Sequence, residues 1–213
     1  VHLAGAGVVD KKWNKAYQQE IIDSRVKSSE LIIEALKNNP HKIKAIISAS
    51  AIGWYGPDIN NNHQFTETDK SDDSFLGNTC KLWEESIEPA TQQGIRVCKI
   101  RTGIVLSNKG GALNEFIKPI KMGVAAILGK GTQIVSWIHV NDLCRIFLFV
   151  LEHQDLSGAY NGVAPHPVSN KNLTLTLAKT LKGAFFMPTY VPAFILKIVM
   201  GQRSIEVLKS CYV

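Results

Sequence analysis

Three features are absent from this chain of 213 residues, and each absence excludes a class of protein. No apolar run approaches the roughly 20 residues that span a membrane, since the best candidate, "VPAFILKIVMG", is short and contains Lys197. The first residues lack the basic start and the apolar core of a signal peptide. The four cysteines form no CxxC pair and no metal-ligand spacing. We therefore expect a cytoplasmic protein with reduced thiols, no bound metal and no membrane partner.

The distribution of charge excludes a further class of partner. Lysine and arginine exceed aspartate and glutamate by 24 to 18, which gives a formal net charge of +6. Positive charge can attract nucleic acid or an anionic ligand. The basic residues are scattered, however, with no dense arginine stripe and no interleaved aromatic platform. We therefore expect no nucleic acid as partner.

Alternating strand and helix patterns indicate the fold class. Apolar residues recur at helical spacing over residues 11–38, and a continuous apolar run at 43–50 is typical of a strand buried on both faces. The run at 95–106 predicts another buried strand that continues into a loop. Further helices are predicted at 74–94, 110–123, 140–153, 170–183 and 192–201, and a further strand at 184–191. This order predicts an α/β fold with a doubly wound parallel sheet over residues 1–160 and a small α/β lobe over residues 161–213.

The glycine turn in "VHLAGAGVVD" is similar to a phosphate-binding loop but is incomplete. Gly5 and Gly7 follow a short apolar segment, yet the third glycine of a G-x-G-x-x-G fingerprint is missing here and everywhere else in the chain. The turn also leads into the polar segment "DKKWNK" rather than into a closely packed helix start. We therefore interpret it as the turn that leaves a strand of the sheet, and not as a pyrophosphate site.

Two predicted strands end in residues that can contact a ligand, because open α/β sheets bind ligands at the carboxyl ends of their strands. In "SASAIGWYG", Ser48 and Ser50 either donate to a ligand carbonyl or ribose, or cap the local backbone. In "RTGIVL", Arg101 either meets a phosphate or carboxylate or pairs with a nearby acidic side chain. Thr102 and Gly103 allow close approach of the backbone to a ligand.

His139 lies in "SWIHVNDL", directly before a predicted helix. The imidazole is either a general acid or substrate ligand, or a structural residue beside Trp137 and Ile138. Asn141 or Asp142 is the predicted N-cap of the helix.

Several of these segments carry a family resemblance. "VHLAGAG", "SASAIGWYG", "RTGIVL", "SWIHVNDL" and "YNGVAPHPVSN" together resemble the extended short-chain dehydrogenase/reductase (SDR) superfamily. "WNKAYQQEIIDSR", "CKLWE", "GGALNEFIKPIKMG" and "GKGTQIVSWIH" narrow the resemblance to its atypical, sugar-nucleotide-epimerase-like branch within the NAD-dependent epimerase/dehydratase superfamily, whose members have also been called cell-division inhibitors. The resemblance implies a Rossmann domain that binds NADP(H) or NAD(H) and a small C-terminal substrate lobe.

The resemblance also implies a position within the family's fold. The family's glycine-rich phosphate motif lies some tens of residues before the segment that matches "VHLAG", and its terminal lobe continues past the segment that matches the last residues here. We therefore expect this chain to lack the first βαβ unit of the family. Binding of the cofactor, NADP(H) rather than NAD(H), is expected only in the full-length protein.

The resemblance assigns roles residue by residue. The residues that it places against the cofactor are Leu3, Ala4, Gly5, Arg25, Ser48, Ala49, Arg101, Thr102, Gly103 and Ile104. Ser50 occupies the usual position of the catalytic serine or threonine, and His139 lies in the substrate-side motif.

One motif of the superfamily is missing. Its working members carry Tyr-x-x-x-Lys on the helix after the catalytic serine, where the lysine lowers the pKa of the acid/base tyrosine and holds the ribose. When Glu84 of "SFLGNTCKLWEE" is aligned with the family's acidic residue, Leu76 stands at the tyrosine position and Cys80 at the lysine position. A shift by one residue recovers Lys81, but its partner is then Gly77. Neither register provides a phenol.

Two functions from different classes follow. The first is an NAD(P)(H)-dependent epimerase (isomerase) or oxidoreductase for a small polar, nucleotide-linked substrate, in which Ser50 binds the substrate oxygen and Tyr55 or His139 transfers the proton. The second, favoured by the missing tyrosine, is a non-catalytic NADP(H)-binding sensor or protein-interaction module. The expected partners are a dinucleotide cofactor and a small-molecule substrate, and the expected oligomer is a homodimer.

Overall fold

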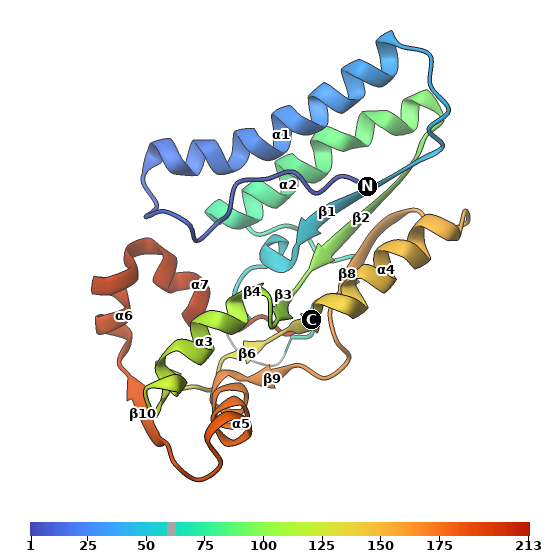
Figure 1. Ribbon diagram of the computed structural model, residues 1–213. Coiled ribbons are helices and arrows are strands. Elements are labelled where there is room, and N and C mark those ends of the chain that lie inside the picture. Colours follow the sequence, from blue (N-terminus) through green and yellow to red (C-terminus); the bar gives the residue numbers. More distant parts are fainter. Residues whose placement is uncertain (59–62) are drawn as a thin grey trace. The chain divides into compact units, whose positions relative to one another are not determined.

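The computed structural model describes residues 1–58 and 63–213, which form two compact units interleaved along the chain (Figure 1). Unit 1 consists of Val1–Gly56, Thr66–Gly103 and Asn141–Gly162. Unit 2 consists of Pro57–Phe65, Ile104–Val140 and Val163–Val213. The sequence predicts two contiguous domains, residues 1–160 and residues 161–213. In the structure, each compact unit is assembled from three separate segments of the chain.

Unit 1 is a parallel sheet covered by helices on both faces. Its elements are α1 (Lys15–Asn38), β1 (Ala45–Ala51), η1 (Ile52–Trp54), α2 (Phe75–Ile87), η2 (Glu88–Gln93), β2 (Arg96–Thr102), α4 (Val140–Glu152) and β8 (Gly158–Gly162). The strands pair in the order β1-β2-β8, and the register places Ser50 opposite Arg101 and Arg101 opposite Asn161. Three residues with polar side chains therefore lie side by side across the sheet.

Alternation of side chains along β1 and β2 builds the two layers of the core in unit 1. Ile46 and Val97 pack under α1 and α2, whereas Ile47, Cys98 and Ile100 pack under α4. The helices lie on opposite faces of these strands in Figure 1. Each fully buried isoleucine contributes about 1.5–3 kcal/mol relative to an exposed one, so both faces specify the sheet.

The first residues of the chain extend this sheet. His2 forms a parallel bridge with Ser48, in which the His2 amide donates to Ile47 O and the Ala49 amide donates to His2 O, both at 2.9 Å. The backbone then turns away through Gly5 and Gly7 to the start of α1. The strand predicted before the glycine turn is therefore a single isolated bridge at His2 in the structure.

Unit 2 is built from short strands and helices. Its elements are β3 (Ile104–Ser107), β4 (Gly110–Gly111), α3 (Ala112–Lys121), β5 (Val124–Leu128), β6 (Ile134–Val135), β7 (Trp137–His139), β9 (Val168–Ser169), α5 (Asn170–Lys182), β10 (Met187–Val191), α6 (Ala193–Met200), η3 (Gly201–Arg203) and α7 (Ser204–Leu208). β5 and β10 pair in parallel, and α3 and α5 pack together around Ile120, Ala125 and Ala178.

The structure confirms the α/β class and the parallel sheet, with local corrections. The first helix starts at Lys15 instead of residue 11, because the side chain of Asn14 caps it by accepting from the Tyr17 amide at 2.8 Å. The N-cap prediction for Asn141 or Asp142 is wrong, since α4 already begins at Val140. The sequence does not predict β4, β5, β6, β7 and β9, because runs of two to five residues carry little periodic signal.

The described residues are expected to contain neither a membrane-spanning helix nor a group of metal ligands. Within 1–58 and 63–213, no helix combines the length and the apolar character needed to cross a bilayer. Across that part of the chain, no three His, Cys, Asp or Glu side chains are grouped as metal ligands would be.

Candidate functional site

A buried ion pair lies where β1 and β2 of unit 1 end. The Arg101 guanidinium donates from Nε to Glu84 Oε1 at 2.8 Å and from Nη2 to Glu84 Oε2 at 3.0 Å. Both side chains are almost fully buried, at 4% and 6% exposure. A bidentate arrangement of this kind is the strongest geometry that an arginine and a carboxylate adopt. Of the two alternatives for Arg101, the structure shows the pairing with an acidic side chain.

Ser50 and Tyr55 are bound into the same network. Ser50 Oγ donates to Glu84 Oε1 at 2.7 Å, and Tyr55 OH accepts from Arg101 Nη1 at 3.1 Å. Tyr55 OH in turn donates to Asn161 Oδ1 at 2.8 Å. The side chains predicted to act on a substrate are thus connected to one another, and both hydroxyl groups already have protein partners.

Residues from three further segments complete the network. Arg101 Nη1 also donates to the backbone oxygen of Glu67 at 3.1 Å. The backbone N–H of Asn161 donates to Glu67 Oε1 at 2.8 Å. The Arg101 guanidinium carbon lies 3.7 Å from the centre of the Trp54 ring, within the range of a cation–π interaction. The network therefore connects β1, η1, α2, β2 and β8 with the loop that contains Glu67.

The electrostatics of the network fix its protonation state. Burial raises the pKa of Tyr55, against the opposing effect of the Arg101 hydrogen bond and charge. Burial lowers the pKa of Arg101, but its hydrogen bonds to Glu84 and Tyr55 more than offset this, so the pKa is raised overall. At neutral pH the phenol therefore keeps its proton and the guanidinium keeps its charge.

A second group of residues surrounds the glycine turn. A Cβ atom on Gly5 would lie 3.0 Å from Cζ and 3.2 Å from both Nη atoms of Arg25. The guanidinium is therefore packed against the Gly5 backbone, which only a glycine permits without displacement. Arg25 Nη1 donates to Ala6 O at 3.1 Å and to Ile21 O at 2.9 Å, and Cζ lies 4.9 Å from the centre of the Trp83 ring.

This guanidinium has unused donors. Among residues 1–58 and 63–213, no carboxylate pairs with Arg25, and its Nε and Nη2 groups have no acceptor. The neighbouring Trp83 Nε1 is buried and also has no hydrogen-bond partner in the described structure. Burial lowers the pKa of Arg25, with the Cys80 thiol acting in the opposite direction. A cation with free N–H groups is suited to a phosphate or to ribose hydroxyls.

The helix α2 presents the residues that replace the missing Tyr-x-x-x-Lys motif. A Cβ atom on Gly53 would lie 3.4 Å from Leu76 Cβ and 3.5 Å from Cys80 Sγ, so both side chains face the loop after β1. Lys81 lies on the exposed side of the helix. The face of α2 that follows Ser50 therefore carries an aliphatic group and a thiol.

The remaining predicted cofactor residues lie before α1, within β1, and around the junction of β2 and β3. Leu3 is exposed at 65%, and Ala4 is exposed beside it. The polar groups of the other residues are used within their own unit. Ser48 Oγ donates to Ala49 O, Thr102 Oγ1 to Ser50 O, the Gly103 amide to Gly162 O and the Ile104 amide to Ser136 O. Their contact with a cofactor stays a prediction.

His139 lies in unit 2, at the end of β7, where it stands opposite Leu106 in the pairing with β3. Its side chain is exposed. Its proposed role in proton transfer stays a prediction.

Sequence reasoning missed several members of the network. The sequence indicates Glu84 only as the position that aligns α2 with the family, and it does not single out Asn161, Glu67 or Trp54. One signal for Glu84 is present in the sequence. "CKLWEE" places acidic residues on the helix between the two strands, where one of them can pair with Arg101. The residues of the loop and of β8 are separated from Tyr55 along the chain, so spacing could not find them.

Comparisons with known proteins agree with one another. A sequence model of the family described as "NAD dependent epimerase/dehydratase family" matches residues 1–162. An epimerase family protein of Staphylococcus aureus (strain NCTC 8325 / PS 47) is 35% identical over 211 residues, which cover 99% of this chain and 69% of the relative. A second epimerase family protein, from Staphylococcus haemolyticus (strain JCSC1435), is 34% identical with the same coverage.

Two solved structures are also similar. The crystal structure of the human epimerase family protein SDR39U1 (isoform 2) with NADPH has a TM-score of 0.89 and 28% identity, and the match covers 99% of this chain and 71% of that one. The nucleoside-diphosphate sugar epimerase from Corynebacterium glutamicum has a TM-score of 0.69 and 34% identity, with coverage of 89% and 41%.

Proposed function

The chain belongs to the NAD dependent epimerase/dehydratase family, and from this membership we propose that the protein is an NADP(H)-dependent epimerase or oxidoreductase for a small polar, nucleotide-linked substrate. NADP(H) is favoured over NAD(H) because the similar human structure contains NADPH. The nucleotide-linked substrate is suggested by the sugar epimerase from Corynebacterium glutamicum.

The observation that carries the proposal is the guanidinium of Arg25 under the glycine turn. Its Nε and Nη2 groups are without acceptors in the described chain, and the missing Cβ of Gly5 leaves the backbone bare beside it. These donors fit the phosphate and ribose groups of a dinucleotide. Leu3, Ala4 and Gly5 would line the cofactor, and Arg25 would bind it.

A bound nicotinamide dinucleotide supplies or accepts hydride. We assign proton exchange to His139, whose imidazole is exposed, because the phenol of Tyr55 is buried, keeps its proton and donates it to Asn161. Ser50 and Tyr55 then act as positioning residues, since their hydroxyl groups hold Glu84 and Arg101 at the ends of β1 and β2.

A second candidate function is favoured by α2. Leu76 and Cys80 occupy the face where the superfamily carries its tyrosine and lysine, and neither can act as the phenol does. The protein would then be a non-catalytic NADP(H)-binding module that senses the cofactor and contacts a protein partner. Both candidates require the dinucleotide, and they differ in turnover.

Titration of the full-length protein with NADPH and with NADH tests the cofactor site. Replacing Arg25 with alanine is expected to weaken NADPH binding about tenfold or more, because a charged hydrogen-bond donor is lost. Lys27→Ala is the matched control, since Lys27 lies on the same helix, is exposed and pairs with Asp23. Unchanged affinity in Arg25→Ala would contradict the assignment of Arg25.

Turnover separates the two candidate functions. We expect NADPH oxidation with keto forms of nucleotide-linked sugars, and His139→Ala is expected to lower kcat by about a hundredfold or more. His41→Ala is the control in unit 1, and Tyr55→Phe should retain turnover. Binding of NADPH with no turnover on any of these substrates would favour the sensor.

A further inference from the structure

Two helices of unit 2 end next to each other. α3 ends at Lys121 and α5 at Lys182, and the two helices pack together on β5. Each helix is followed by a glycine with positive φ, Gly123 at 83° and Gly183 at 61°. The loops after them are joined where the Met187 amide donates to Gly123 O at 2.8 Å, at the start of the parallel pair β5–β10. Both helix ends therefore form one surface.

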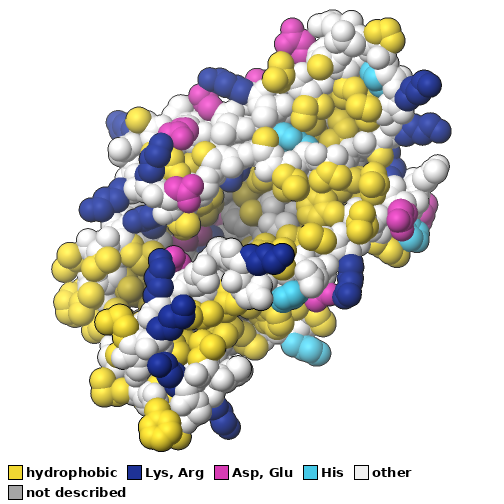
Figure 2. Space-filling model, viewed as in Figure 1, with side chains coloured by type: hydrophobic (Ala, Val, Ile, Leu, Met, Phe, Trp, Pro, Cys, Tyr) yellow, Lys and Arg dark blue, Asp and Glu magenta, His cyan; other side chains and the backbone are white. Residues whose placement is uncertain are grey.

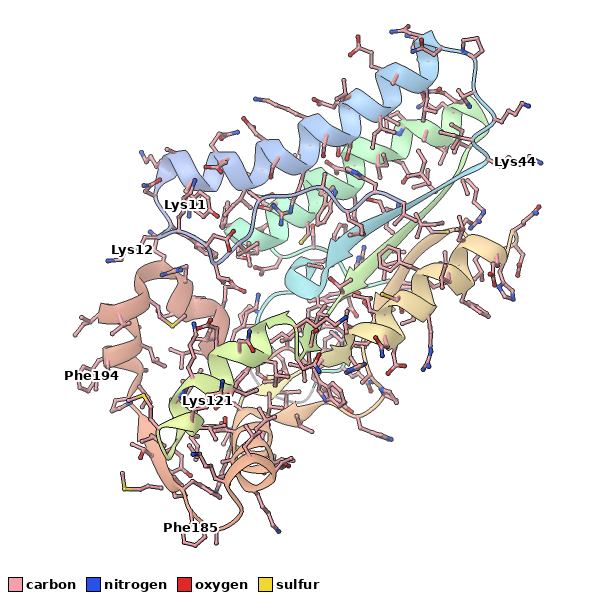
Figure 3. The ribbon with its side chains drawn as sticks, in the orientation of Figure 1. Lys11, Lys12, Lys44, Lys121, Phe185 and Phe194 are labelled. Carbon is pink, nitrogen blue, oxygen red and sulfur yellow. The ribbon has the colours of Figure 1, made fainter. Side chains whose placement is uncertain are left out.

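This surface exposes large apolar side chains. Met122 is 84% exposed and Phe185 is 87% exposed, the highest values among the large hydrophobic side chains of the described residues. Phe186, by contrast, turns inward and packs on the core around Ile120. Figure 3 shows Phe185 projecting from the loop between α5 and β10. An exposed phenylalanine at a loop end gains nothing for folding, because it contacts water in the folded and unfolded states alike.

Lysines lie in the helical turns that precede these apolar residues. The last turns of α3 and α5 carry Lys118, Lys121, Lys179 and Lys182, all of them exposed. Figure 2 shows hydrophobic and basic side chains side by side over this part of unit 2. We call the four lysines together with Met122 and Phe185 the basic tip.

The basic tip lies in unit 2, which accounts for the positive net charge of the protein. Unit 2 contains ten lysines and arginines and three acidic residues, whereas unit 1 contains fourteen and fifteen. Of the three acidic residues in unit 2, Glu115 pairs with Lys118 and Glu206 pairs with Lys209, and the third is Asp58. Lys121, Lys179 and Lys182 form no ion pair with a described residue.

The helix dipoles explain only part of this arrangement. Lysines in the last turn of a helix interact favourably with its partial negative charge, so their presence alone needs no ligand. That effect gives no reason for a phenylalanine and a methionine to be exposed to water directly after these turns. Apolar side chains that project from a basic surface are the combination that favours the interface of an anionic bilayer.

We propose that the basic tip binds the surface of an anionic lipid bilayer, with Phe185 and Met122 inserted among the headgroups and the four lysines on the lipid phosphates. The sequence predicts no membrane partner because it lacks a spanning segment, and a contact with the membrane surface needs no such segment. A second copy of the chain is a poorer occupant, because two tips in contact would bring eight lysines together.

Sedimentation of the full chain with vesicles tests the proposal. We expect binding to vesicles of phosphatidylcholine with phosphatidylglycerol, weakened by salt, and little binding to phosphatidylcholine alone. Phe185→Ser with Met122→Ser should lower the partition coefficient about tenfold or more. Each of Lys121→Gln and Lys182→Gln should lower it about fivefold. Leu31→Ser with Lys44→Gln, at exposed positions of unit 1, is the control that should leave it unchanged.

A second readout reports insertion directly. In Phe185→Trp, the indole emission should shift to the blue when anionic vesicles are added, whereas in Leu31→Trp it should not. Equal binding to both kinds of vesicle, equal binding by the tip variants, or no shift in Phe185→Trp would overturn the proposal. It would also fail if the wild-type chain were dimeric, bound no vesicles and became monomeric on Phe185→Ser, because the tip would then be a contact between copies.

Discussion

Charged side chains are paired and buried in the network of unit 1, whereas those of the basic tip in unit 2 are exposed and mostly unpaired. In the network, the Arg101 guanidinium is bound by both carboxylate oxygens of Glu84 along one edge and is stacked on Trp54. At the tip, three lysines have no ion-pair partner in the described chain and stand in solvent. Unit 1 has nearly balanced charges, and unit 2 carries the excess.

This contrast distinguishes the charges that stabilise the fold from those that are available to a ligand. A charge that is removed from water must be paired, because an unpaired buried ion is costly. An exposed lysine has no such requirement and contributes little to folding. Substitutions in the network should therefore change the free energy of unfolding, and those at the tip should change only what the protein binds.

The largest effect is expected for Glu84→Ala. This change leaves Arg101 buried without its carboxylate and removes the acceptor of Ser50, so it should lower the free energy of unfolding by about 3–5 kcal/mol. Urea denaturation of the variant and of the wild type measures the change.

A double variant sharpens this prediction. Glu84→Ala combined with Arg101→Leu should lose less than the sum of the two single changes, because no uncompensated charge is left behind. The exposed neighbour Glu85→Ala serves as the control. A loss below about 1 kcal/mol for Glu84→Ala would show that water reaches the network and that the comparison between the units is wrong.

A smaller effect is expected from His2 when the pH is lowered. Burial lowers the pKa of His2 below its usual 6.5, and its Nε2 lies 3.1 Å from Ser29 Oγ. The unfolded chain therefore binds this proton more readily than the folded chain does. The contribution of His2 to stability is present above pH 6.5 and is lost as the pH falls below it. Unfolding at pH 7, 6 and 5 should show a decline that is shallower in His2→Gln, and equal slopes would contradict the prediction.

The smallest effect is expected for Glu115→Ala in unit 2. Glu115 and Lys118 form an ion pair of 2.6 Å on α3, but both side chains are more than two-thirds exposed. Solvent screens such a pair, so the free energy of unfolding should stay within the error of the measurement. Binding to anionic vesicles should instead rise, because Lys118 is released. A stability loss comparable to that of Glu84→Ala would remove the distinction between the two units.

The fold was predictable where the sequence has a strong period. The helix α1 and the strand β1 carry long apolar patterns, and the structure contains them close to their predicted bounds. The predicted helix at 74–94 is divided into α2 and η2, and the run at 95–106 is divided at Gly103 into β2 and β3. The short strands of unit 2 depend on pairing between distant segments, as β5 does with β10, which no local pattern encodes.

The candidate site was predictable only in part. Strand ends pointed to Ser50 and Arg101, because ligands bind there in open α/β sheets. Their connection through Glu84 could not be read from the sequence, since it depends on the packing of α2 against β1. The packing of Arg25 against Gly5 also requires the coordinates, because the missing Cβ becomes meaningful only once the opposite side chain is known.

The stacking of Arg101 on Trp54 gives the protein an internal optical probe. The emission of an indole responds to a cation held against its face, and here that cation is fixed by Glu84 and Tyr55. A chain in which Trp13, Trp83 and Trp137 are replaced by phenylalanine would keep Trp54 as its single tryptophan. Its fluorescence would then follow the opening of the network during denaturation or ligand binding without any added label.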